Sequence, residues 1–173
     1  MPGLTIRIKK NKDGSASLAC VRDDGSTTWQ RQEGSLGAHF PPHDLTHYAV
    51  ETTLGYDRGF YGLIAAGWEL SDFGAPWPRG PIPSEAREVE VLVGALDLDR
   101  MTLQKKTTAE FNEQVRFAAS RDARTNFVPR ELTEGELLRV RERLAQLFAD
   151  WAATAPGSTL ELLFDRAPAN HRG

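Results

Sequence analysis

The sequence predicts an α+β domain, and three observations lead to that class. Apolar and polar residues alternate in three stretches near the N-terminus, which is the period of strands with one buried face. Stretches between residues 42 and 151 carry apolar residues at the three- and four-residue spacing of amphipathic helices. A fourth alternating stretch follows at residues 158–164. We therefore expect an N-terminal antiparallel three-stranded meander, joined by a C-terminal strand and packed against four to five helices.

The three N-terminal strands are expected at residues 4–9, 15–22 and 27–31. Asn-Lys-Asp-Gly and Asp-Asp-Gly-Ser sequences separate them and supply the residues that tight turns favour. The alternation puts Leu18 and Cys20 on the buried face of the sheet. Arg7 and Lys9 are expected on the solvent face.

Two helical stretches and a stiff connection are expected after the meander. The first helix should run over residues 42–54, because proline suits the first turn of a helix and Gly55 is typical of the position just after a helix. A second, mostly apolar helix is expected at residues 57–71. The proline-rich segment 73–83 should be an extended internal loop rather than a domain boundary.

The later helices have clear N-terminal signals. Ser84 can cap a third helix, and Thr107 with Glu110 forms a capping box ahead of a fourth. Thr133 with Glu136 forms another capping box ahead of the longest amphipathic stretch. These signals predict three helices between the proline-rich loop and the last strand.

Length and composition exclude several classes of protein. A length of 173 residues suits one compact domain, so we expect residues 1–173 to form a single domain. A net charge of −3 disfavours a nucleic-acid partner. The N-terminus is basic and alternating, and no apolar run is long enough for a bilayer, so we expect no signal peptide and no membrane partner. Cys20, the single cysteine, cannot form an internal disulfide, which favours a cytoplasmic location.

One group of residues has side chains that are typical of metal-binding or catalytic sites. His39, His43 and His47 recur every fourth residue, and Glu51 continues the series. The prolines at 41 and 42 interrupt it, so we expect His39 to precede the helix rather than stack one turn below His43. On the helix itself, His43, His47, Glu51 and Asp44 share a sector of about 100°.

Two neutral imidazoles and a carboxylate suit a divalent transition metal such as zinc. We therefore take His43, His47 and Glu51 as the candidate metal ligands. His43 and Glu51 are about 12 Å apart along the helix axis, so a carboxylate from elsewhere is a reasonable third ligand. The nearest candidates in the sequence are Asp57, Glu69 and Asp72.

Two other interpretations of the same residues stay open. In a structural one, Asp44 caps the helix N-terminus, and His47 pairs with Glu51 to tie this helix to the sheet or to the next helix. In a metal-free catalytic one, His47 is a general base that Glu51 orients, and it acts on a substrate near Tyr48 or Tyr61. The sequence identifies no nucleophile, and Cys20 is expected to be structural.

Trp77 supplies an alternative of another class. A tryptophan on a stiff proline-rich loop is typical of a protein contact or a pocket lid, although Trp77 can also fold back over the core. The candidate functions are thus a metal-binding or small-ligand-binding protein, with hydrolysis as its activity, and a non-catalytic protein–protein interaction domain. Either is compatible with a homo-oligomer.

The segment 40–51 (Phe-Pro-Pro-His-Asp-Leu-Thr-His-Tyr-Ala-Val-Glu) is followed at 59–67 by Gly-Phe-Tyr-Gly-Leu-Ile-Ala-Ala-Gly. These residues resemble a group of uncharacterised bacterial proteins that share a Pro-x-His-Asp-Leu-x-His block and have no established activity. The likeness covers about thirty residues. It implies a bacterial cytoplasmic protein and no particular reaction.

Overall fold

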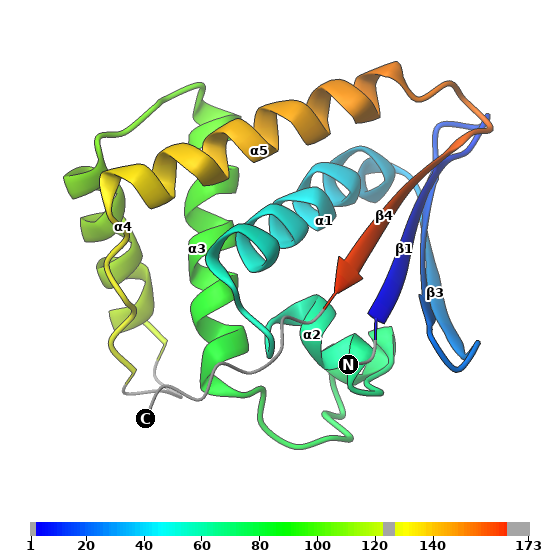
Figure 1. Ribbon diagram of the computed structural model, residues 1–173, viewed down its shortest axis with the longest axis horizontal. Coiled ribbons are helices and arrows are strands. Elements are labelled where there is room, and N and C mark those ends of the chain that lie inside the picture. The colour runs from blue at the N-terminus through cyan, green and yellow to red at the C-terminus, as the bar shows by residue number, and fades with distance from the viewer. Residues whose placement is uncertain (1–2, 123–126, 166–173) are drawn as a thin grey trace.

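A four-stranded antiparallel sheet and a layer of helices make up residues 3–122 and 127–165, which the computed structural model describes (Figure 1). The strands follow the order β3-β2-β1-β4 across the sheet. Their bounds are β1 Gly3–Lys10, β2 Ala16–Arg22, β3 Thr27–Gln32 and β4 Thr159–Asp165. This arrangement confirms the predicted α+β fold, with an N-terminal meander and a C-terminal strand that returns to pair with β1.

The alternation of apolar residues determines the register of the sheet. Ile6 on β1 lies opposite Cys20 on one side and Leu162 on the other, so apolar side chains from three strands meet on one face. Leu18 and Cys20 are completely buried, as predicted. Arg7 and Lys9 on β1 point to the exposed face. The helices therefore cover one side of the sheet.

The helices are α1 Ser35–Leu54, α2 Phe60–Ala65, the 3-10 helix η1 Leu70–Phe73, α3 Ser84–Thr102, α4 Thr108–Ser120 and α5 Glu134–Ala153. Helix α1 packs against α3, α5 and β2, and it runs through the middle of the molecule (Figure 1). All eight residues from Asp44 to Glu51 are buried. Helix α1 is thus a core helix rather than an amphipathic surface helix.

The predicted start of the first helix was wrong. Helix α1 begins at Ser35, and Pro41 and Pro42 lie inside it. A proline inside a helix removes one backbone hydrogen bond. Helix α1 nevertheless continues through Pro41 and Pro42, because it is packed on several sides by α3, α5 and β2. His39 therefore does stack on His43, with ring centroids 5.7 Å apart. Gly55 ends the helix as predicted, in a left-handed conformation with φ 75°.

The predicted helix at residues 57–71 is two shorter pieces, α2 and η1. Gly67, with φ 105°, ends α2. Its positive φ turns the chain so that the backbone N–H of Trp68 donates to the Leu63 carbonyl. The N–H of Gly67 likewise donates to Ile64, which completes a Schellman motif. The chain then passes through η1 and the proline-rich loop to α3.

The later helices follow their sequence signals more closely. Thr107 accepts a hydrogen bond from the backbone of Glu110, and Thr133 accepts one from that of Glu136, so both predicted capping boxes are confirmed. Ser84 is instead the first residue of α3 and makes no capping hydrogen bond. None of the described helices is long and apolar enough to cross a membrane.

We expect Cys20 to resist thiol reagents in the native protein. Its side chain is completely buried on β2, and burial raises the pKa of the thiol to about 12, so little reactive thiolate is present at mildly alkaline pH. Ellman's reagent should release one equivalent of thionitrobenzoate from the guanidinium-denatured chain and almost none from the native protein over the same time. A native rate equal to the denatured rate would contradict this placement, and Cys20→Ser provides the blank.

Candidate metal centre

A strip of ionisable side chains on α1 is buried in the protein interior. Asp44, His47 and Glu51 are each at most 3% exposed. Burying a charged group away from water is costly unless it is paired, so each of these side chains needs a partner from a neighbouring element. Those partners come from β3, α2 and α3.

Asp44 does not cap a helix, contrary to the structural interpretation of the sequence. It lies well inside α1, because the helix begins at Ser35. The side-chain amide of Gln32 on β3 donates to its Oδ2 atom at 2.9 Å. Burial raises the pKa of Asp44 to about 6, and the Gln32 hydrogen bond opposes that rise.

Glu51 ties α1 to α2. Its carboxylate accepts hydrogen bonds from the backbone N–H groups of Tyr61 and Gly62, in the first turn of α2, at 3.1 and 3.2 Å. A Cβ on Gly59 would lie 2.5 Å from Glu51 Cδ, so the glycine gives the carboxylate room to approach. Glu51 Oε1 also lies 3.5 Å from His47 Nδ1. Glu51 thus links α1 to α2 through the α2 backbone, but the His47–Glu51 hydrogen bond that the structural interpretation expected is not formed.

His43 is held by a carboxylate on α3. Its Nδ1 atom lies 2.7 Å from Asp97 Oδ2. Arg100 donates to the other oxygen of Asp97 at 3.2 Å. Burial alone would raise the pKa of Asp97, but His43 and Arg100 outweigh it and hold that pKa below its usual range. With Nδ1 engaged, Nε2 is the nitrogen through which His43 can bind a metal ion or a ligand.

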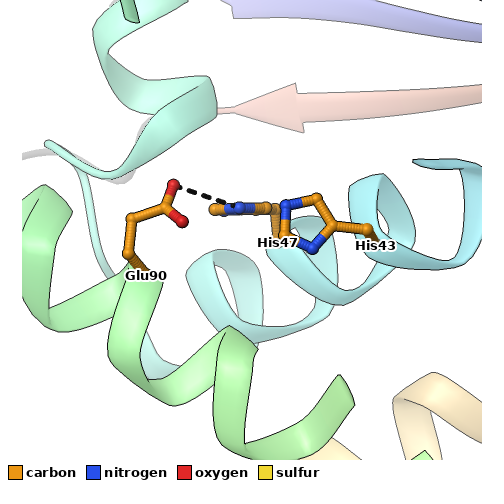
Figure 2. A group of neighbouring side chains, drawn as sticks. All are labelled: His43, His47 and Glu90. Atoms are coloured by element: carbon orange, nitrogen blue, oxygen red, sulfur yellow. Dashed lines mark ion pairs between the residues drawn. The ribbon is translucent and has the colours of Figure 1, made fainter. Parts of the chain in front are cut away.

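His47 lies between two carboxylates. Its Nε2 atom is 3.3 Å from Glu90 Oε1 on α3 (Figure 2). Its Nδ1 atom faces Glu51 Oε1 at 3.5 Å, a distance too long for a good hydrogen bond. Burial disfavours the charged imidazolium, but Glu90 and Glu51 outweigh it and raise the pKa of His47 to about 9.

His43, His47 and Glu90 form the group that can hold a metal ion among the described residues. Each offers one ligand atom, and the three atoms lie within 4.8 Å of one another. Figure 2 shows both imidazoles reaching from α1 toward the Glu90 carboxylate on α3. Ligand atoms about 2.0–2.1 Å from a tetrahedral zinc ion are about 3.3 Å apart, and the His47–Glu90 distance already has that value.

The sequence-predicted ligands are thus only partly brought together. The structure groups His43 and His47 as expected, but Glu90 takes the third place, while Glu51 lies behind His47 on its Nδ1 side. The other suggested carboxylates, Asp57, Glu69 and Asp72, do not belong to the group. The spacing of seven residues between Glu90 and Asp97 puts both carboxylates on one face of α3, but the sequence does not show that this face meets α1.

A cavity of about 890 Å³ opens beside this group. His43, His47 and Glu90 line part of it, and apolar side chains form much of the remaining wall. Trp77, on the proline-rich loop, belongs to that wall and is 41% exposed. The loop that the sequence marked as a lid or contact surface therefore borders the candidate site.

Comparisons with known proteins add no functional information. No family model matches the chain, and neither the search of curated proteins nor that of solved structures returned a match.

We expect Glu51→Ala to destabilise the protein by about 3–5 kcal/mol, because it leaves buried N–H groups of α2 and the His47 imidazole without their partner. Urea denaturation followed by circular dichroism measures this change. Glu161→Ala is the matched control: it removes a carboxylate that is half-exposed and paired with Arg7, so its effect should be far smaller. Equal effects of the two substitutions would contradict the buried role of Glu51.

Proposed function

We propose that the protein binds a divalent transition-metal ion, with zinc the best match, through His43, His47 and Glu90, and uses it as a hydrolase. The observation that carries this proposal is the convergence of three ligand atoms, from two helices, at the wall of a large cavity. Two imidazoles and one carboxylate are a common ligand set of catalytic zinc.

The residues behind the ligands support the proposal. Metal-binding histidines usually direct the second ring nitrogen at a carboxylate, which fixes the ring orientation. Asp97 meets Nδ1 of His43, and Glu51 faces Nδ1 of His47. Both imidazoles thereby keep Nε2 for the metal, and both orienting carboxylates are buried.

The number of ligands favours a catalytic over a structural role. Structural zinc sites are closed by four protein ligands, whereas catalytic sites use three and leave a position for water or substrate. A zinc ion held in this way supplies Lewis acidity and activates water. The residues of this chain contribute the ligand set, the orientation of both imidazoles and a largely apolar cavity wall beside them.

The alternative is a non-catalytic interaction domain that uses the Trp77 loop. The partial exposure of Trp77 is compatible with a protein contact, but its place in the cavity wall accounts for the same residue within the metal proposal. We also propose a cytoplasmic location, which rests on the single, buried cysteine.

Zinc binding is the first test. Protein purified without a His tag, stripped with chelator and dialysed against zinc, should hold about one zinc ion by elemental analysis. Glu90→Gln keeps the shape of a half-exposed side chain and should abolish this binding, because a neutral amide is a poor zinc ligand. His39→Ala removes an exposed histidine of the same helix outside the ligand group and should leave binding intact. Absence of zinc from the wild type, or equal binding by Glu90→Gln, would refute the proposal.

A second comparison separates ligands from the residues that orient them. We expect Asp97→Asn and Glu51→Gln to weaken zinc affinity by about 10–100-fold, which is the usual effect of removing an orienting carboxylate. Glu90→Gln should lower the zinc affinity more than either of these substitutions, because it removes a ligand. Competition with a chromogenic chelator measures all three affinities. If Glu51→Gln abolished binding while Glu90→Gln had no effect, Glu51 would be the ligand, as the sequence alone suggested.

A further inference from the structure

The cavity wall next to the candidate metal ligands is aromatic. The rings of Phe60 and His47 lie with centroids 5.0 Å apart, and Phe73 follows at 4.8 Å from Phe60. Trp77, Leu70 and Val91 extend the apolar lining. A ligand group that contacts His47 is therefore also next to a continuous apolar surface.

The rim of the cavity is held in place. Arg79 donates to Asp72 at 3.0 Å and to the Gly67 carbonyl at 2.8 Å, which fixes the proline-rich loop on the segment that precedes it. Two turn hydrogen bonds on either side of Trp77 define its backbone, which has φ 58°. Such a conformation is uncommon for a bulky residue, so the surrounding contacts determine it. Trp77 is thus preorganised as part of the wall.

The charges of the cavity do not suit an anionic ligand. Among the described residues that line it, Arg87 is the one arginine or lysine, against three carboxylates: Asp44, Glu90 and Asp122. Arg87 is already engaged, because it donates to the Ile82 carbonyl at 3.0 Å and pairs with Asp122 at 3.2 Å. Even when the charge of a bound zinc ion is added to that of Arg87, the three carboxylates balance it, so phosphates and multiply charged acids meet no excess of positive charge here.

From these features we propose that the site takes an uncharged substrate with an aromatic group, of the aryl ester or aryl amide class. Its carbonyl oxygen faces the ligand group of His43, His47 and Glu90, and its ring lies against Phe60, Phe73 and Trp77. A cavity of about 890 Å³ is in the usual size range for such molecules. This inference rests on the proposed zinc site.

Hydroxamic acids serve as probes, because they are mostly uncharged at neutral pH and lose one proton when their two oxygens bind zinc. We expect the zinc-loaded protein to bind benzohydroxamate at least about tenfold more tightly than acetohydroxamate, since the phenyl ring buries its apolar surface against the aromatic wall. Succinohydroxamate, which carries an extra carboxylate, should bind no better than acetohydroxamate. Isothermal titration calorimetry measures all three.

Variants of the wall test the placement of the ring. Trp77→Ala should reduce the ratio of benzohydroxamate affinity to acetohydroxamate affinity several-fold. Trp29→Ala is the matched control, because it removes an exposed tryptophan of β3 that does not line the cavity. Phe73→Ala, checked for folding by circular dichroism, should act as Trp77→Ala does.

The possible results separate this inference from the proposed function. If zinc binds but the two simple hydroxamates have equal affinity, or the carboxylated one binds best, the substrate class is wrong and the metal site stands. If Trp77→Ala and Phe73→Ala leave the preference unchanged, the aromatic wall does not hold the ring. If the wild type binds no zinc, the proposed function fails and this inference fails with it.

Discussion

The buried ionisable side chains of α1 require polar partners from the elements that pack against this helix. Helix α1 crosses the core, yet it carries Asp44, His47 and Glu51 on buried positions. Each of them needs a partner from another element and has one. Asp44 accepts a hydrogen bond from Gln32 on β3, His47 pairs with Glu90 on α3, and Glu51 accepts hydrogen bonds from the first turn of α2. The polar contacts of this helix thus define how the sheet, α2 and α3 are placed around it.

The same contacts give the candidate site its form. Helix α3 brings Glu90 and Asp97 to α1, one against each imidazole. Without a metal ion, the two histidines and their carboxylates are partners of one another. In the metal-bound state that we propose, Asp97 and Glu51 would keep the rings oriented while Glu90 would become a ligand. The proposed site would then need little rearrangement, because the helix packing already brings its residues together.

The sequence predicts much of the fold and less of the site, for physical reasons. Alternation around Leu18 and the capping box at Thr107 are local signals, and both hold in the structure. The prediction that α1 begins at Pro42 is wrong, because the packing of a core helix outweighs the preference of proline for the first turn. Spacing brings His43 and His47 together, since they lie one turn apart. Glu90 requires knowledge of which face of α3 meets α1, and a single sequence does not contain it.

Anomalous diffraction at the zinc edge, from crystals of the zinc-loaded protein, shows whether His43, His47 and Glu90 bind one metal ion as proposed. We expect one strong peak about 2.0–2.2 Å from a nitrogen of each imidazole and from an oxygen of Glu90. A peak bound to other residues, or no peak among these three side chains in crystals that contain zinc, would contradict it.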